Sequence, residues 1–256
     1  MTTSWDAKLY NSKHNFVFHY GSSLIELLKP KKNDLILDLG CGAGQLTEEI
    51  AKSGAKVIGM DASKSMIESA SNTFPELEFR IANAESFDFA EKFDAIFSNA
   101  TLHWVKNYKA AAANMFQHLN KKGRLIIEFG GKGNVQKIEQ TLKAVLKEKN
   151  YPKQANINLW FFPSIAEYTN ILEEAGFEVR LAELYDRPIK LADEKTGIVD
   201  WISMFGKTFF EGIPENDAKI IKNEVQNRLK PALLKEDGWY ADYRRLRIIA
   251  YKNSKY

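Results

Sequence analysis

The sequence predicts an α/β fold with a doubly wound sheet, and three observations carry that prediction. The run Leu35–Leu39 is short and apolar on both faces, as in a buried parallel strand. Three glycines follow it at alternate positions, Gly40, Gly42 and Gly44, before a helical pattern opens. An acidic residue, Asp61, ends the next strand, roughly twenty residues past the glycines. Sheets of this kind bind ligands at the carboxyl ends of their strands.

The rest of the chain continues the alternation of helices and strands. Pro30 stops a first helix over 22–28, Gly54 ends the helix over 46–52, and Gly176 ends a helix that Ser164 caps. Further helices are expected from 63 and over 110–119 and 136–149, and strands over 55–60, 77–82, 93–98, 123–129, 177–185 and 240–251. Before the last strand, about 55 residues carry helical patterns over 194–210 and 214–234, where a sheet needs only a short connection.

Composition limits the classes of partner. The chain has 256 residues and a net charge of +3, from 36 basic and 33 acidic residues, which is too small to argue for nucleic acid. No apolar run is long enough to span a membrane, and no signal-peptide core is seen. The single cysteine, Cys41, excludes an internal disulfide and fits a cytoplasmic protein. We expect Cys41 to be a small packed residue rather than a nucleophile.

The glycine turn and Asp61 together indicate a nucleoside ligand. Glycines let the backbone turn sharply and approach a ligand without an intervening Cβ. Asp61 is placed to accept hydrogen bonds from two ribose hydroxyls, although it could instead cap the helix that opens at Ser63. A dinucleotide fingerprint needs a third glycine where Gln45 stands, which disfavours a nicotinamide dehydrogenase. A plain strand–turn–helix corner remains the structural alternative.

The stretch from Asp38 to Gly44 reads Asp-x-Gly-x-Gly-x-Gly and resembles motif I of the class I S-adenosylmethionine-dependent methyltransferases. Asn99–Trp104 resembles motif IV of the members that act on small molecules, and the resemblance covers 30–130. It implies S-adenosylmethionine as cofactor and no metal. Asn83 stands where family members often carry Asp, and Met66 could touch the adenine or fill the core. The implied cofactor-binding residues are Asp38, Gly40, Cys41, Gly42, Gly44, Asp61, Ala62, Met66, Asn83, Ala84, Asn99, Ala100 and Tyr10.

A looser resemblance, to the trans-aconitate methyltransferase-like branch, covers the remaining segments. It is carried by the aromatic N-terminal stretch, by Trp160–Pro163 and by the helical insertion. It implies a seven-stranded sheet with the last strand antiparallel, and a small-molecule acceptor. The expected organisation is one domain over 1–256, with an N-terminal cover (1–29), a cofactor-binding core (30–130) and a helical cap inserted at 186–241.

Candidates for the acceptor site come from three places in the sequence. His103 and Trp104 follow the fourth strand at the ligand end of the sheet, and His103 is either a base or a packed lid residue. Arg245 and Arg247 share a face of the last strand and could bind a carboxylate bidentately, or form surface ion pairs. Trp160 is a further acceptor-binding candidate, and Tyr20 a further catalytic one.

These observations favour methyl transfer to a small molecule. A carboxylate acceptor would be ionised already and need no base, whereas a phenol, amine or carbon acceptor would need one, such as His103 or Tyr20. C-, N- or O-methylation of another metabolite, such as a lipid or quinone, stays open. So does a protein that binds the cofactor without turnover. We expect no nucleic-acid partner and no membrane span, and the oligomeric state is undetermined.

Overall fold

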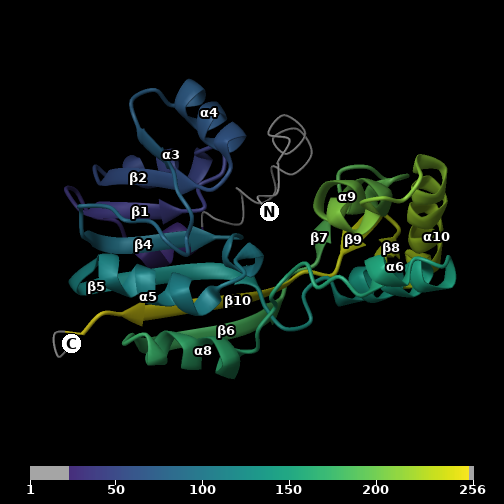
Figure 1. The fold of residues 1–256 in the computed structure, drawn as a ribbon. Helices are drawn as coiled ribbons and strands as arrows, with labels where there is room; N and C mark the ends of the chain where they lie inside the picture. The colour runs from purple at the N-terminus through teal and green to yellow at the C-terminus, as the bar shows by residue number, and fades with distance from the viewer. Residues whose placement is uncertain (1–22, 254–256) are drawn as a thin grey trace. The chain divides into compact units, whose positions relative to one another are not determined.

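The computed structural model describes residues 23–253, which form two compact units (Figure 1). Of these residues, the first unit holds 23–132, Phe161–Leu184 and 245–253. The second unit holds Gly133–Trp160 and Tyr185–Arg244. The second unit therefore includes a segment, 133–160, that lies outside the insertion expected at 186–241. That the insertion acts as a cap stays a prediction.

A seven-stranded sheet organises the first unit, in the order β3-β2-β1-β4-β5-β10-β6. Its strands are β1 (Leu35–Leu39), β2 (Lys56–Asp61), β3 (Glu78–Ile81), β4 (Phe93–Asn99), β5 (Leu119–Gly130), β6 (Glu178–Asp186) and β10 (Arg244–Tyr251). The β1–β2, β1–β4, β2–β3 and β4–β5 pairs are parallel, and β10 runs antiparallel to β5. The predicted doubly wound, mostly parallel sheet with an antiparallel last strand is confirmed. The strand order reverses between β1 and β4, the position at which such sheets bind ligands.

Helices cover both faces of this sheet, as the continuous burial of β1 requires (Figure 1). On one face Leu37 packs with residues of α5 (Tyr108–His118) and α8 (Ile165–Glu174). On the other face Ile36 packs with the helical residues around Leu24 and with α3 (Gln45–Ala51). The helix α4 (Lys64–Thr73) contacts β2 and β3. Ser164 caps α8 with a full capping box to Glu167, as predicted.

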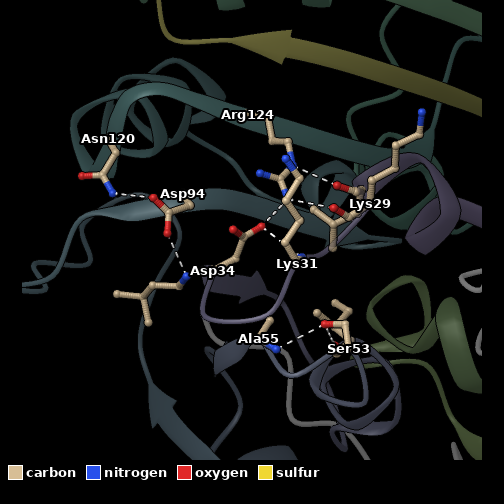
Figure 2. A network of polar contacts seen from close by, with 11 residues as sticks. Lys29, Lys31, Asp34, Ser53, Ala55, Asp94, Asn120 and Arg124 are labelled. Atoms are coloured by element: carbon tan, nitrogen blue, oxygen red, sulfur yellow. Dashed lines mark hydrogen bonds and ion pairs between the residues drawn. The ribbon is translucent and has the colours of Figure 1, made fainter.

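The amino ends of the central strands are joined by a polar network (Figure 2). Arg124 of β5 donates to the carbonyl of Leu28 at 2.8 Å and to Asp34 at 2.7 Å. Asp94 of β4 accepts from the N–H of Leu35 at 2.9 Å. This network ties the first described helix to the sheet at the edge opposite the ligand end.

The second unit is helical with a small sheet. Its helices are α6 (Gln136–Glu148), α7 (Pro152–Ala155), α9 (Gly197–Phe205) and α10 (Glu215–Leu233), with a 3₁₀ turn, η2 (Lys207–Phe210). Its three short strands, β7 (Ile189–Lys190), β8 (Leu234–Lys235) and β9 (Gly238–Ala241), pair in the order β7-β9-β8. The sequence did not reveal β7 and β8, because two-residue strands carry no periodicity. Among the described residues, no helix combines the length and apolarity that a bilayer crossing needs.

Two sequence expectations about this region were wrong. The single strand expected over 240–251 is two strands, β9 and β10, because Asp242 between them turns away to accept the N–H of Lys137 at 2.8 Å. The single helix expected over 194–210 breaks at Gly206 into α9 and η2. Glycine is a weak helix former, so a break at this residue is physically reasonable.

Candidate cofactor and acceptor site

The glycine loop after β1 is shaped by contact with the segment after β4. Gly40 has a φ of +78°, and a Cβ on it would lie 2.1 Å from Oγ1 of Thr101. That hydroxyl donates to the carbonyl of Gly40 at 3.2 Å. At Gly42, by contrast, a Cβ would meet nothing within 4 Å. The loop is therefore packed on one side and open at its middle glycine, as a cradle for a ligand requires.

The loop is also fixed to the end of β2. The N–H groups of Gly40 and Cys41 donate to the carbonyl of Met60 at 2.7 and 2.9 Å. Asp61 accepts the N–H of Gly42 at 3.1 Å and the N–H of Ser63 at 2.8 Å. A carboxylate offers about four acceptor positions, so these two bonds leave capacity for hydroxyl groups.

The alternative that Asp61 caps α4 does not hold. The side-chain cap of α4 is Ser63, whose hydroxyl accepts the N–H of Met66. Asp61 instead bonds the N–H two residues further on, which orients its carboxylate at the loop. Ala62 between them is exposed.

A second carboxylate lies beneath the loop. Asp38 is 2% exposed and accepts the hydroxyl of Thr47 at 2.6 Å. The pKa of Asp38 is raised to about 7. Burial is the largest cause, the hydrogen bond from Thr47 opposes it, and the charge of Asp61 adds to it. Burial also raises the pKa of Asp61. A buried and a half-buried carboxyl group at one loop favour a ligand that carries positive charge.

Cys41 and Gly44 complete the loop. Burial raises the pKa of the Cys41 thiol, and the nearby charges of Asp38 and Asp61 raise it further. The thiol therefore stays protonated near neutral pH, which suits a packed residue and opposes a nucleophile. A Cβ on Gly44 would lie 2.8 Å from the Phe79 ring, so this glycine lets β3 approach the loop.

The residues expected to face an adenine lie after β3 and in α4. Asn83 is exposed, and its Oδ1 accepts the N–H of Glu85 at 2.9 Å. Ala84 and Met66 are buried, which favours the core-filling alternative for the Met66 side chain. Glu85 is half-buried, and its carboxylate accepts the N–H groups of Lys106 and Asn107 at 3.1 and 3.0 Å.

The segment after β4 leaves the sheet through an unusual residue. Asn99 is buried at the end of β4, and Ala100 has a φ of +58°, which is uncommon outside glycine. The N–H of Ala100 donates to the carbonyl of Glu128 at 2.7 Å, which holds this conformation. Backbone strain of this kind is concentrated at functional sites. The chain then enters a 3₁₀ turn, η1 (Leu102–Trp104).

His103 in η1 is 7% exposed and lies against the end of β5. Its Nδ1 accepts the N–H of Gly130 at 3.4 Å, and its carbonyl accepts the N–H of Phe161 at 2.9 Å. Its ring centroid is 5.4 Å from that of Trp104 and 5.6 Å from that of Phe162. Burial lowers the pKa of His103 well below its ordinary value, and the charge of Arg245 lowers it further. The ring is therefore neutral at physiological pH.

The two arginines of β10 differ in their surroundings. Arg245 is 3% exposed and pairs in register with Gly130, the residue whose N–H meets His103. Arg247 forms an ion pair with Glu128, with an N–O distance of 2.6 Å and a carboxylate side chain that is 1% exposed. The preceding residue, Arg244, forms a more exposed ion pair with Asp186.

The remaining candidates come from different parts of the chain. Trp160 belongs to the second unit, where its ring lies 6.0 Å from Trp201 and 5.8 Å from Phe209. Trp104 is half-buried beside His103. Tyr10 and Tyr20 lie outside the described residues.

Sequence reasoning missed three residues that build this site: Thr47, Thr101 and Glu128. Glu128 could have been noticed, because it is the one carboxylate in the apolar second half of β5, which reads Leu-Ile-Ile-Glu-Phe. The two threonines left none, since their roles depend on partners in other elements. Within residues 23–253, no group of three or more His, Cys, Asp or Glu side chains is arranged to hold a metal ion.

Comparison with known proteins agrees with this geometry. A methyltransferase-domain model matches residues 37–127. An uncharacterized methyltransferase of Schizosaccharomyces pombe is 34% identical over 97% of this chain and 98% of its own length. Trans-aconitate 2-methyltransferase of Escherichia coli O157:H7 is 26% identical, over 92% of this chain and 93% of its own.

Solved structures share the fold. The YcgJ protein of Bacillus subtilis has a TM-score of 0.65 at 18% identity, covering 93% of this chain and 99% of its own. The open glycine loop, the acceptor capacity of Asp61 and the two carboxyl groups of Asp38 and Asp61 fit a nucleoside ligand with a cationic sulfonium. The chain therefore belongs to the class I methyltransferases, and its cofactor is S-adenosylmethionine.

Proposed function

We propose that the protein transfers a methyl group from S-adenosylmethionine to a carboxylate oxygen of a small molecule, which forms a methyl ester. The observation that carries this proposal is the position of Arg245. Its guanidinium is buried at the carboxyl end of the sheet, in register with Gly130 and close enough to His103 to affect its pKa. A guanidinium binds a carboxylate through two parallel hydrogen bonds.

The cofactor assignment follows the order of the strands. The glycine loop would hold the methionine end, with the carboxyl groups of Asp38 and Asp61 opposite the sulfonium. Asp61 would accept from the ribose hydroxyls. Asn83 and Ala84 would meet the adenine, and the segment from Asn99 would face the methionine amino group. The bound cofactor supplies an activated methyl group.

The protein's contribution is then to align the acceptor oxygen with the methyl group and to exclude water. A carboxylic acid with an ordinary pKa near 4 is ionised at neutral pH, so its oxygen is a nucleophile without a base. Positioning that oxygen against the methyl group, in a site from which water is excluded, lowers the barrier. The name of the Escherichia coli relative, trans-aconitate 2-methyltransferase, supports an acid as the acceptor class.

The test uses S-adenosylmethionine labelled in its methyl group and a panel of small di- and tricarboxylic acids. Mild base should release labelled methanol from the product, because esters hydrolyse under these conditions and methyl ethers and amines do not. If the cofactor binds and no acid is esterified, the carboxylate proposal fails. Another acceptor class, such as a lipid or quinone, or a role without turnover would then replace it.

Matched arginine variants sharpen this test. Arg245→Gln should lower kcat/KM for the acid about 10- to 100-fold, as expected for removing a hydrogen-bonded charge, and leave cofactor affinity unchanged. Arg244→Gln is the control, since the neighbouring Arg244 pairs with Asp186 and its side chain is 41% exposed. Equal activity in the two variants would remove Arg245 from the acceptor site.

A further inference from the structure

The hydrogen bond between Gly130 and His103 fixes the tautomer of the imidazole ring. The backbone N–H of Gly130 can only donate, so Nδ1 of His103, 3.4 Å away, presents its lone pair. A neutral imidazole carries one N–H and one lone pair. The ring proton of His103 is therefore on Nε2.

The surroundings also keep the ring neutral. A second proton would place an N–H of the ring against the N–H of Gly130. It would also add a positive charge to a residue that is 7% exposed and next to Arg245. Burial lowers the pKa of His103, so the neutral form persists over the physiological range. The ring can therefore donate a hydrogen bond from Nε2–H, while its basic atom, Nδ1, already accepts the N–H of Gly130.

His103 lies close to the parts of the chain that we propose bind the cofactor and the acceptor. His103 lies two residues after Thr101, which is bonded to the glycine loop, and against Gly130, which pairs with Arg245. Within the part of the chain that the structure describes, Nδ1 is the only ring nitrogen of His103 with a hydrogen-bond partner. A donor and a guanidinium thus lie at the same edge of the sheet.

We infer that His103 is a specificity-determining residue that donates Nε2–H to the acceptor carboxylate beside Arg245, and that it is not a general base. This inference rests on the proposed function and names a second group that binds the same acid. In the reaction the carboxylate oxygen forms the new O–CH₃ bond as the S–CH₃ bond breaks, and that electron pair stays on sulfur. No proton is transferred, so no base is needed.

Selectivity follows from the same arrangement. A phenol or an ammonium group must lose a proton before or during methyl transfer. His103 cannot take that proton, because its lone pair accepts the N–H of Gly130. The site therefore favours acceptors that are anionic already.

Two substitutions separate the two ring nitrogens. His103→Asn keeps a short side-chain acceptor for the N–H of Gly130 and loses the distal donor. His103→Gln reaches further and can present an amide N–H near the position of Nε2. We expect kcat/KM for the acid to fall about 10- to 100-fold in His103→Asn and less than about 5-fold in His103→Gln. Cofactor affinity should stay within about 2-fold in both.

The two variants distinguish a donor from a base. Because burial keeps His103 neutral, kcat/KM of the wild-type protein should be flat between about pH 6 and pH 9 in either role, so the pH profile alone does not separate them. A base would make both variants equally inactive, whereas a donor predicts that His103→Gln keeps most of the activity. Equal inactivity of the two variants, or wild-type activity in His103→Asn, overturns the inference.

Nitrogen NMR of the ring tests the tautomer without any acceptor. With ¹⁵N-histidine, the signals of His103 are assigned among the four histidines by their loss in His103→Asn. We expect a protonated Nε2 and an unprotonated Nδ1 throughout the same pH range. A proton on Nδ1 overturns the inference whatever the acceptor is. If the ring has the expected tautomer but the protein esterifies no acid, the proposed function has failed.

Discussion

Thr101 and Gly40 hold the two halves of the cofactor-binding edge together. The Thr101 hydroxyl donates to the Gly40 carbonyl at 3.2 Å and to the carbonyl of Asn99 at the same distance. This contact joins the loop after β1 to the segment after β4 at the reversal of strand order. The space that it leaves at Gly40 is too small for any side chain, since a Cβ there would lie 2.1 Å from Oγ1.

Gly40→Ala should therefore displace the loop and abolish cofactor binding. Gly212→Ala is a matched control, because Gly212 has the same φ of +78° and a Cβ there would meet nothing within 4 Å. Both variants bear the left-handed strain, about 1 kcal/mol, and only Gly40→Ala bears the clash. Calorimetric titration with S-adenosylhomocysteine measures the affinities. Equal affinity in the two variants would mean that Thr101 moves aside freely.

Asp61→Ala should weaken cofactor binding by about 1.5–3 kcal/mol, the usual effect of deleting a charged hydrogen-bond acceptor. The loss has two sources: the ribose contacts that we propose, and the N–H of Gly42, which Asp61 accepts at 3.1 Å. The dissociation constant, measured by fluorescence or calorimetry, reports the sum. A wild-type constant would exclude Asp61 from the site.

The control for Asp61 is Asp94→Ala. Asp94 also accepts a backbone N–H, that of Leu35 at 2.9 Å, but at the amino ends of the strands. This variant should lose stability and keep its cofactor affinity. A similar loss of affinity in both variants would show that general loosening of the sheet explains the effect.

The sequence predicted the parts of the fold that depend on residues close together in the chain. The run Leu35–Leu39, the glycines and Asp61 lie within one strand–helix–strand unit, so their spacing was enough to place them. The break at Asp242 depends on Lys137, 105 residues away, and the burial of Arg247 depends on Glu128, 119 residues away. No window of sequence contains both partners of such a pair. His103 could likewise be predicted as a site residue, but its role could not, because that role depends on its contact with Gly130.

The carboxyl group of Asp38 should make stability depend on pH. Its pKa in the folded chain is about 7, above the ordinary value of 3.8. Between these values the folded state binds more protons than the unfolded state, so stability falls as pH rises through this window. The slope from Asp38 is at most about 1.4 kcal/mol per pH unit.

Asp38→Asn mimics the protonated form and should remove this slope. The amide can still pair with the Thr47 hydroxyl, which Asp38 contacts at 2.6 Å. Urea unfolding at pH 5 and pH 7 should show wild-type stability falling more steeply than that of the variant. Parallel slopes in the two proteins would mean that Asp38 is ionised at pH 5.

Arg124→Met should destabilise the first unit by about 2–4 kcal/mol, because it removes the guanidinium that pairs with the carboxylate of Asp34 and donates to the Leu28 carbonyl (Figure 2). Both charged side chains of the pair are under one-fifth exposed, at 18% and 17%. Arg180→Met is the control, since Arg180 and Glu178 are 55% and 42% exposed and such pairs contribute about 0–1 kcal/mol. Chemical unfolding measures both free energies. Equal losses would show that the network at the amino ends of the strands adds no more than a surface ion pair.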